Sequence, residues 1–345
     1  MKIIYLLSQN KRDAITLSVS DMAQALGAVG HKIHVVTADK SLASDLKAEN
    51  VASTYASMGG TFDFVSPMKI SKLIDDGQPA IMHVNSLHEC YIADRARNLS
   101  GNKAVKIVLC HNHVDEPKNI ALALRHMSAV DGSIFTSEPV KDIVCRALRI
   151  DTATHKSALL NPSAPKRNAQ YAEPLIMWHG NITEPTAIRC IVQTMAKADS
   201  GIKACIMGTG RGQTVIPVLN EARKLGVYDR MDWKGDVTDI RRLTNTAFAA
   251  LLPLHEHAAV QEAAEYIGAG IPIILSRRHP ASLMVECLGA GIVTDNESPA
   301  AFADAINALA ADNASLRDKI SREMNRPDFD AFLSSIISFY NSLLS

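Results

Sequence analysis

The chain has 345 residues, of which 47% are hydrophobic and 21% charged, so it is long enough for two globular domains and too apolar to be disordered. Its 36 basic and 36 acidic residues balance, and no dense Lys/Arg block occurs, which excludes the charge pattern of a nucleic-acid-binding protein. No apolar run approaches the roughly 20 residues of a membrane span, and the opening stretch MKIIYLLSQNKRD does not have the pattern of a signal peptide. We expect a cytoplasmic protein, for which a peripheral contact with the inner face of the membrane stays open.

The cysteines are scattered along the chain and form no C-x-x-C pair. Because such pairs are typical of disulfide frameworks and metal clusters, the scatter favours buried, reduced thiols. The six positions are Cys90, Cys110, Cys145, Cys190, Cys205 and Cys287.

In the first half of the chain, short apolar runs alternate with longer segments of helical period. Repeated strand–helix–strand units of this kind predict a parallel sheet with helices on both faces. The predicted strands occupy residues 2–8, 31–38, 79–86, 105–112 and 133–138, and the predicted helices occupy residues 19–30, 88–101, 119–132 and 139–150.

The stretch LLNPSAPKRNAQYAEP interrupts this alternation with three prolines and few apolar residues. We interpret residues 161–174 as a linker between a first domain, 1–160, and a second domain, 175–327. The strand–helix pattern restarts after the linker, and residues 328–345 form a last amphipathic helix. The chain is therefore predicted to hold two doubly wound, Rossmann-like α/β domains. Ligands bind beyond the carboxyl ends of strands in such sheets, so the cleft between the domains is the expected site.

One candidate ligand site is the stretch CIMGTGRG in the second domain. Gly208 and Gly210 follow a predicted strand and precede a helix, where glycine lets the backbone approach a phosphate. A plain tight turn explains them equally well. The first domain has no glycine-rich loop after its first strand, which argues against a classical NAD enzyme.

Three histidines close strands of the first domain. His83 ends one strand, and His111 and His113 end the next. A histidine there can face the ligand and act as a hydrogen-bond donor or as a general acid or base. We favour this role for His111, and a hydrogen bond to a neighbouring loop for the other two.

The stretch PLHEHAAVQEAAEYIGAGIPIIL, residues 253–275, is rich in titratable side chains. A zinc-binding helix would need a histidine at Ala259, two residues beyond His257, so the metal interpretation is weak. Glu262 and Glu265 are three residues apart and share one face of a helix that begins after a strand. They are therefore candidates for ligand binding.

The segment AFAALLPLHEHAAVQEAAEYIGAGIPIIL resembles the signature of the retaining glycosyltransferases of family 4, which have the GT-B fold. The segments LNPSAP, KACIMGTGRG and TLSVSDMAQALGAVGHKIHVVTAD are similar to the family's flanking elements, so the resemblance covers nearly the whole chain. It implies two domains facing a central cleft, a terminal helix that returns to the first domain, and a nucleotide-sugar donor bound without a metal.

The resemblance also implies roles for individual residues. Glu265 matches the glutamate that holds the ribose hydroxyls, and a carboxylate suits two vicinal hydroxyls because it accepts two hydrogen bonds. His111 matches a histidine near the donor sugar, and His257 stands where the family has its first glutamate. The further donor-binding candidates are Gly180, Asn181, Gly208, Gly210, Arg211 and Glu262.

The chain departs from the family in the charges around the donor diphosphate. Asn181 and Thr186 occupy the positions of an arginine and a lysine, and their loss must be compensated because charge develops on the leaving group. Arg211, Arg277 and Arg278 could substitute, although ordinary surface arginines are the alternative. Asn10, Lys11 and Arg12 replace the glycine-rich loop and could lie on the acceptor side.

These features predict a hexosyltransferase-like enzyme that moves a sugar from a UDP- or GDP-sugar, with retention, to a glycan or lipid-linked acceptor in cell-envelope or exopolysaccharide assembly. No cofactor or metal is expected. The alternative is a catalytically degenerate GT-B subunit that binds a glycan or a partner transferase without turnover. A sugar-nucleotide epimerase or a phosphorylase is a third, weaker possibility.

Overall fold

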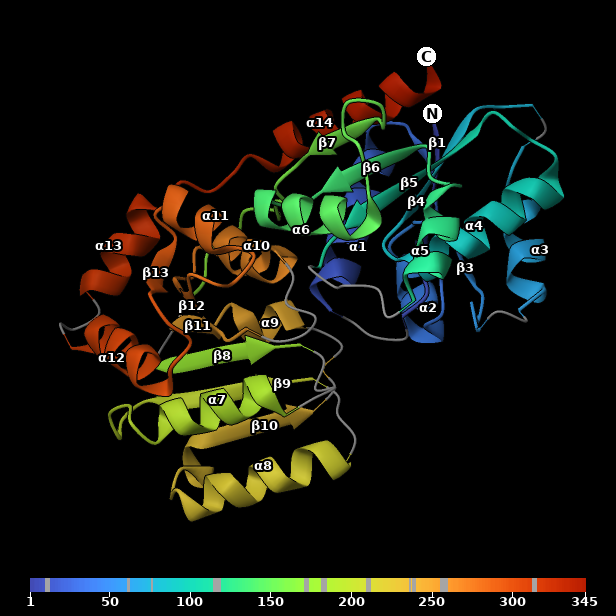
Figure 1. Cartoon of the computed structure of the whole chain (residues 1–345). Coiled ribbons are helices and arrows are strands. Elements are labelled where there is room, and N and C mark those ends of the chain that lie inside the picture. The colour runs from blue at the N-terminus through green and yellow to red at the C-terminus, as the bar shows by residue number, and fades with distance from the viewer. Residues whose placement is uncertain are drawn as a thin grey trace. The chain divides into compact units, whose positions relative to one another are not determined.

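The computed structural model describes residues 1–9, 13–60, 63–75, 77–113, 119–170, 174–180, 185–208, 212–235, 237, 240–254, 260–311 and 315–345. These residues form two compact units (Figure 1). The first contains the opening strand, Thr16–Pro162 and Asp330–Ser345, and the second contains Ser163–Phe329 together with residues 13–15.

The first unit is built on a seven-stranded sheet in the order β3-β2-β1-β4-β5-β6-β7, in which every neighbouring pair is parallel. Its central strands are apolar on both faces, because helices cover both sides of the sheet. The strands are β1 (Lys2–Leu7), β2 (Lys32–Thr37), β3 (Ser53–Tyr55), β4 (Ala80–Val84), β5 (Val105–His111), β6 (Gly132–Phe135) and β7 (Ser157–Leu159).

Side chains that alternate along these strands face two different layers of helices. Ile4, Met82 and Ile107 point to one face, where they share a core with Ile70 of α3 and Ile92 of α4. The helices of this unit that precede the linker are α1 (Ala14–Ala28), α2 (Lys40–Ala48), α3 (Val65–Ser71), α4 (Leu87–Ser100), α5 (Ile120–Met127) and α6 (Glu138–Leu148).

The last helix, α14 (Phe329–Leu344), packs on the other face of the first sheet. A Cβ added to Gly132 of β6 would lie 2.9 Å from Leu343 and 3.0 Å from Phe339, so a glycine lets the helix approach the strand closely. Tyr340 is fully buried, and its hydroxyl lies 2.6 Å from Nδ1 of His83 in β4. The apolar stripe of the terminal segment is thus packed against the sheet.

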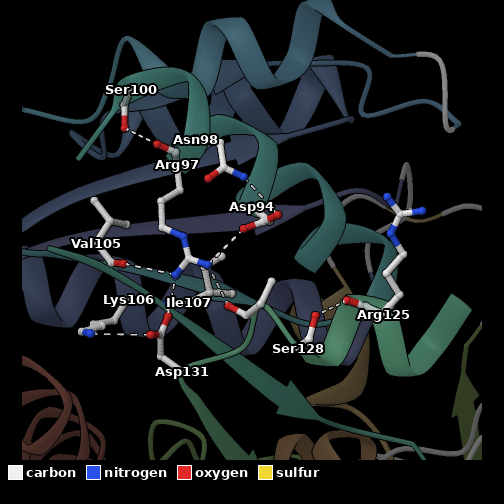
Figure 2. A network of polar contacts seen from close by, with 11 residues as sticks. Asp94, Arg97, Asn98, Ser100, Val105, Lys106, Ile107, Arg125, Ser128 and Asp131 are labelled. Atoms are coloured by element: carbon white, nitrogen blue, oxygen red, sulfur yellow. Dashed lines mark hydrogen bonds and ion pairs between the residues drawn. The ribbon is translucent and has the colours of Figure 1, made fainter. Parts of the chain in front are cut away.

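A polar network stabilises the amino ends of β5 and β6 (Figure 2). Arg97 of α4 donates to Asp131 at 2.7 Å, to Asp94 at 3.0 Å and to the backbone oxygen of Ala129 at 3.0 Å. Asp131 also accepts the N–H of Ile107 at 2.9 Å. Because Arg97 is only 18% exposed and shares two carboxylates, this arginine joins helix to sheet at the edge away from the strands' carboxyl ends.

The second unit has a six-stranded parallel sheet in the order β10-β9-β8-β11-β12-β13. Its strands are β8 (Leu175–His179), β9 (Lys203–Met207), β10 (Met231–Gly235), β11 (Ala249–Leu252), β12 (Ile273–Ser276) and β13 (Gly291–Thr294). Its helices are α7 (Thr186–Met195), α8 (Gly212–Lys224), a 3₁₀ turn (Tyr228–Arg230), α9 (Ile240–Thr244), α10 (Val260–Ala269), α11 (Ser282–Cys287), α12 (Pro299–Ala310) and α13 (Ser315–Glu323).

Residues 163–170, which lie in the predicted linker, are irregular but fixed to the second unit. Arg167 N donates to the oxygen of Gly268 at 2.7 Å, and Ala169 N donates to the oxygen of Ala269 at 3.1 Å. The segment therefore runs along the end of α10, and it carries the Arg167 side chain to that helix.

The cysteines are all free thiols. Cys90, Cys110 and Cys205 are buried, whereas Cys287 is exposed, which corrects the expectation of uniformly buried thiols. Within the described part of the chain, no helix has the length and apolar character needed to cross a membrane.

Candidate functional site

Each sheet has one place where the strand order reverses direction. In the first sheet it lies between β1 and β4, and in the second it lies between β8 and β11. Loops leave in opposite directions from such a switch point, so the backbone there is open to ligands at the carboxyl ends of the strands. The two switch points are therefore the positions to compare.

The carboxyl edge of the second sheet carries glycine after three adjacent strands: Gly180 after β8, Gly208 after β9 and Gly235 at the end of β10. Gly208 has φ +145°, and a Cβ there would lie 1.9 Å from the carbonyl oxygen of Gly180. Gly208 N donates to the oxygen of Gly235 at 2.7 Å. A Cβ at Gly208 would clash with the carbonyl oxygen of Gly180, so glycine lets the end of β9 pack closely against Gly180, and we interpret this edge as a candidate place for the close approach of a ligand.

Glu265 lies on α10, is 3% exposed, and contacts two arginines. Arg241 Nη2 donates to Oε1 at 2.9 Å, and Arg241 Nε and Arg167 Nη2 donate to Oε2 at 3.2 Å and 3.0 Å. A buried carboxylate needs such partners, because desolvation would otherwise make its charge costly. Glu265, the residue predicted to bind the ribose, is thus held by Arg167 of the segment that follows the first unit and by Arg241 of α9.

A buried histidine–tyrosine pair lies beside Glu262 and Glu265. His179 ends β8, and its Nδ1 lies 3.0 Å from the hydroxyl of Tyr266 on α10. Burial lowers the pKa of His179, although the charges of the two glutamates act in the opposite direction. Glu262 is itself 7% exposed. The end of β8 and the helix after β11 therefore bring a buried imidazole and two buried carboxylates together at the second switch point.

Glu297 fixes the loops on the far side of this switch point. It follows β13, and its carboxylate accepts the backbone N–H of Leu254 at 2.6 Å and the hydroxyl of Ser276. These residues lie at the carboxyl ends of β11 and β12, so one carboxylate holds the ends of two neighbouring strands.

In the first unit, the side chain of His111 packs into the sheet. Its ring stacks on Phe135 with the ring centroids 4.9 Å apart, and its Nε2 lies 3.2 Å from the hydroxyl of Ser133, which also contacts His155 at 2.9 Å. Burial, with a smaller contribution from His155, lowers the pKa of His111 to about 3. The ring is neutral at pH 7, and its contact with a donor sugar stays a prediction.

A second strand-end histidine, His83, is also buried, between the ring of Tyr5 and the hydroxyl of Tyr340. Burial lowers its pKa to about 4. Its partner is a tyrosine of α14 and not the neighbouring loop that we expected from the sequence.

Several predicted site residues lie outside the described part of the chain. They are Asn10, Lys11, Arg12, Asn181, Gly210, Arg211 and His257. Among the described candidates for a diphosphate-binding cation, Arg277 is 55% exposed and pairs with Glu286 at 2.8 Å and with Asp295 at 3.5 Å. These contacts agree with the surface alternative for Arg277. The described residues include no group of three His, Cys, Asp or Glu side chains arranged to hold a metal.

Sequence reasoning did not find Arg167, Arg241, His179 or Gly235. Gly235 could have been found, because it ends a strand next to two other strands that are followed by glycine. Arg167 and Arg241 could not have been found, because they are 98 and 24 residues from Glu265 and no periodic pattern in a sequence relates residues so far apart.

Two family models together match most of the chain. The model for Glycosyltransferase Family 4 matches residues 15–155, and the model for Glycosyl transferases group 1 matches residues 173–312. The chain belongs to the glycosyltransferases. Each model matches one unit, so this glycosyltransferase carries its two family domains in the two sheets described above. No curated protein matches it by sequence.

Solved structures place this glycosyltransferase in the GT-B fold. HepE from Anabaena, crystallised with UDP-glucose, has a TM-score of 0.82 at 13% identity over 99% of this chain and 100% of its own. Sucrose-phosphate synthase from Thermosynechococcus elongatus has a TM-score of 0.73 at 14% identity, with 99% of each chain covered. The lipopolysaccharide outer core galactosyltransferase WaaB, in its apo form, has a TM-score of 0.68 at 15% identity, with 99% of each chain covered.

Proposed function

We propose that this glycosyltransferase transfers a hexose from a nucleotide-sugar to a glycan or lipid-linked acceptor, with retention of configuration, in cell-envelope or exopolysaccharide assembly. The observation that carries the proposal is the glycine edge of the second sheet. Gly180, Gly208 and Gly235 lie at the carboxyl ends of β8, β9 and β10, and β8 borders the switch point. The helix after that switch point, α10, carries Glu262 and Glu265. The UDP-glucose complex of HepE supports a UDP-sugar as the first donor to test, with a GDP-sugar as the alternative.

In this proposal, Glu265 accepts a ribose hydroxyl of the donor. Its Oε2 already accepts two hydrogen bonds, whereas Oε1 accepts one from Arg241 and keeps a second lone pair. One hydroxyl can therefore bind Oε1 without displacing an arginine. His111 and His257 are proposed contacts of the donor sugar, and Gly210, Asn181 and Arg211 complete the proposed donor pocket.

The proposed reaction needs a stable leaving group and an acceptor hydroxyl that loses its proton. The departing nucleoside diphosphate can take that proton on the face from which it leaves, so no enzyme base is assigned. The protein's contribution is to orient the donor and to stabilise the charge that develops on the diphosphate. No metal is assigned to this step.

The ribose contact is tested by removing a hydroxyl from the ligand as well as the carboxylate from the protein. Wild-type protein is expected to bind UDP about tenfold more tightly than 2′-deoxy-UDP or 3′-deoxy-UDP in isothermal titrations, because a hydrogen bond to a charged group is lost. Glu265→Gln is expected to abolish this discrimination, while Glu286→Gln, at an exposed ion pair of the same unit, should keep it. Equal discrimination by Glu265→Gln and the wild type would rule out the ribose role.

A non-catalytic binding subunit is the second candidate function. The specific observations that favour it are Thr186 and Asn181 at the two positions where the family has cations, and the surface pairing of Arg277. A nucleotide-release assay with UDP- and GDP-sugars separates the candidates. Turnover with any donor supports the enzyme, whereas donor binding without turnover, together with tight association with another transferase, supports the subunit.

A further inference from the structure

The first switch point is occupied by a side chain of the protein. Glu89 lies in the first turn of α4 and is 1% exposed. Its Oε1 accepts the backbone N–H of Ser8 at 2.6 Å, and its Oε2 accepts the backbone N–H of Asn85 at 2.6 Å. Ser8 and Asn85 are the first residues after β1 and β4, the two strands between which the sheet order reverses.

The local sequence predicts a different partner for this glutamate. Ser86 and Glu89 have the S-x-x-E spacing of a capping box, in which the glutamate bonds back to the N–H of the capping serine. The serine does cap the helix, because its hydroxyl accepts the N–H of Glu89 at 3.2 Å. The carboxylate instead reaches Asn85, one residue earlier, and Ser8, on the neighbouring strand.

The Glu89 carboxyl group is held mainly by backbone donors, and the charge of the neighbouring His88 contributes less. Among the described residues, no lysine, arginine or histidine forms an ion pair with Glu89. Burial raises the pKa of Glu89, while the N–H groups of Ser8 and Asn85 act against that shift. Two converging backbone N–H groups and a helix N-terminus are the elements with which α/β folds bind phosphate.

The same edge is linked further across the sheet by side-chain amides. Asn85 Nδ2 lies 3.4 Å from the oxygen of Leu6 in β1, and Asn85 Oδ1 accepts from Asn112 Nδ2 at 3.1 Å. Asn112 also donates to the backbone oxygen of Cys110 in β5 at 3.2 Å. The carboxyl ends of β1, β4 and β5 are therefore connected through residues that contact Glu89 or its partners.

We propose that Glu89 is a built-in anion that occupies the ligand position of the first switch point, excludes a donor phosphate from it, and positions Ser8 and Asn85 for the acceptor side of the reaction. It is a positioning residue, because it acts through the backbone of these two residues. The part about the acceptor rests on the proposed function. The part about the anion position stands on the two hydrogen bonds and the topology alone.

Chemical rescue tests the anion position without any substrate. Glu89→Gly removes the carboxylate and leaves two N–H groups facing a space that formate fits. Sodium formate, compared with sodium chloride at equal ionic strength, is expected to raise the melting temperature of Glu89→Gly and not that of the wild type. Glu138→Gly, which removes a 51% exposed glutamate from the first turn of α6, is the matched control and should not respond.

Amide hydrogen exchange covers the case in which the glycine variant does not fold. In Glu89→Gln, one of the two N–H groups meets an amide NH₂ in place of an oxygen, so exchange at Ser8 or Asn85 should be faster by about tenfold or more. Unchanged exchange at both amides in Glu89→Gln, or no formate response in a folded Glu89→Gly, overturns the proposal.

The acceptor role is tested separately by steady-state kinetics. Glu89→Gln is expected to raise KM for the acceptor by about tenfold with an unchanged dissociation constant for the donor. An unchanged acceptor KM, or a donor constant weakened to the same extent, overturns the positioning role. If the protein proves to be non-catalytic, the formate response and the amide exchange are unaffected, so failure of the proposed function can be told from failure of this inference.

Discussion

The two sheets of this glycosyltransferase have the same winding but differ at their carboxyl edges. The first switch point is filled by Glu89, and Asn85 and Asn112 extend a side-chain network from it. The edge of the second sheet carries Gly180 and Gly208, with backbone where side chains would otherwise stand. The two switch points therefore share a topology, but the described residues at the first one include a buried glutamate and those along the second sheet's carboxyl edge include glycines.

A buried histidine–tyrosine pair is common to both sheets, and its surroundings differ between them. Each sheet has a buried histidine near the end of a central strand whose Nδ1 contacts a helix tyrosine: His83 with Tyr340 and His179 with Tyr266. Among the described residues, carboxylates act on the pKa of the histidine in the second unit, where Glu262 and Glu265 are both buried, and not on that of His83 in the first. The shared part is packing, and the part that differs carries the proposed chemistry.

Adding a side chain at the glycine edge of the second sheet should have the largest effect. Gly208→Ala places a Cβ 1.9 Å from the Gly180 oxygen at φ +145°, so the backbone must shift. The free energy of unfolding of the second unit should fall by about 3 kcal/mol or more, and donor binding should be lost. Both tryptophans, Trp178 and Trp233, lie in this unit, so their fluorescence in urea titrations reports it. Gly212→Ala is the control, because its nearest contact would be Ile216 at 3.6 Å.

Removing the carboxylate of α10 should have the next largest effect on stability. Glu265→Ala leaves Arg167 and Arg241 without their buried partner, and we expect a loss of about 3 kcal/mol in the same fluorescence titration. Glu265→Gln should lose less, because the amide oxygen can still accept from one arginine. An unchanged free energy of unfolding in Glu265→Ala would mean that the ion pairs do not persist in solution.

Breaking the amino edge of the first sheet should change stability without changing binding. Arg97→Ala removes the hydrogen bonds that join α4 to Asp131 and to the backbone of Ala129 (Figure 2). Unfolding followed by circular dichroism should show a loss of about 2 kcal/mol. Donor affinity should stay at the wild-type value, and a weaker affinity would contradict the assignment of ligand binding to the carboxyl edges.

Acid should destabilise the first unit through His83. The unfolded histidine takes up a proton near pH 6.5, whereas the buried one does so only near pH 4. The unfolded state therefore binds more protons in this window, and stability that is complete above pH 6.5 decreases by up to about 1.4 kcal/mol per pH unit on the way down. In His83→Asn, urea titrations at several pH values should show a slope smaller by this amount; an identical slope would contradict the buried neutral imidazole.

The smallest effect is expected at the surface of the second unit. Arg277→Ala removes an exposed arginine that pairs with Glu286 and Asp295. Such pairs contribute little in water, so donor affinity should change by no more than a few-fold. A large loss of donor affinity in isothermal titration would show that Arg277 leaves these partners to bind the diphosphate. The donor-binding edge of the second sheet would then extend beyond β12.

The sequence alone predicted the two α/β units well, because buried parallel strands are continuous apolar runs and the helices between them keep a distinct period. Gly208 directly follows a predicted strand, whereas Glu265 was inferred from its place in the helix after a strand and from the family resemblance, and the ligand roles of both stay predictions. The sequence could not give the direction of a side chain at a strand end. His111 turns toward Ser133 on the neighbouring strand, and that contact depends on sheet order and not on spacing.

Long-range partners were beyond sequence reasoning for a related physical reason. The S-x-x-E spacing indicates a helix cap for Glu89, but the N–H of Ser8 is 81 residues away and is brought near only by the pairing of β1 with β4. A motif limits which local bonds are possible. The tertiary structure decides which of them form.

The position of α14 has a consequence for biosynthesis. The first unit is discontinuous in the chain, because its terminal helix is encoded after the whole of the second unit. During synthesis, β6 and the residues Tyr5 and His83 therefore emerge from the ribosome long before Tyr340 and Leu343, which cover them in the folded protein, have been made. The nascent first unit must wait with the part of its sheet that α14 covers still exposed, whereas the second unit can complete its own fold as soon as Phe329 emerges. We expect a chain truncated at residue 329 and held on the ribosome by an added segment long enough to span the exit tunnel to be protease-resistant in the second unit and sensitive in the first.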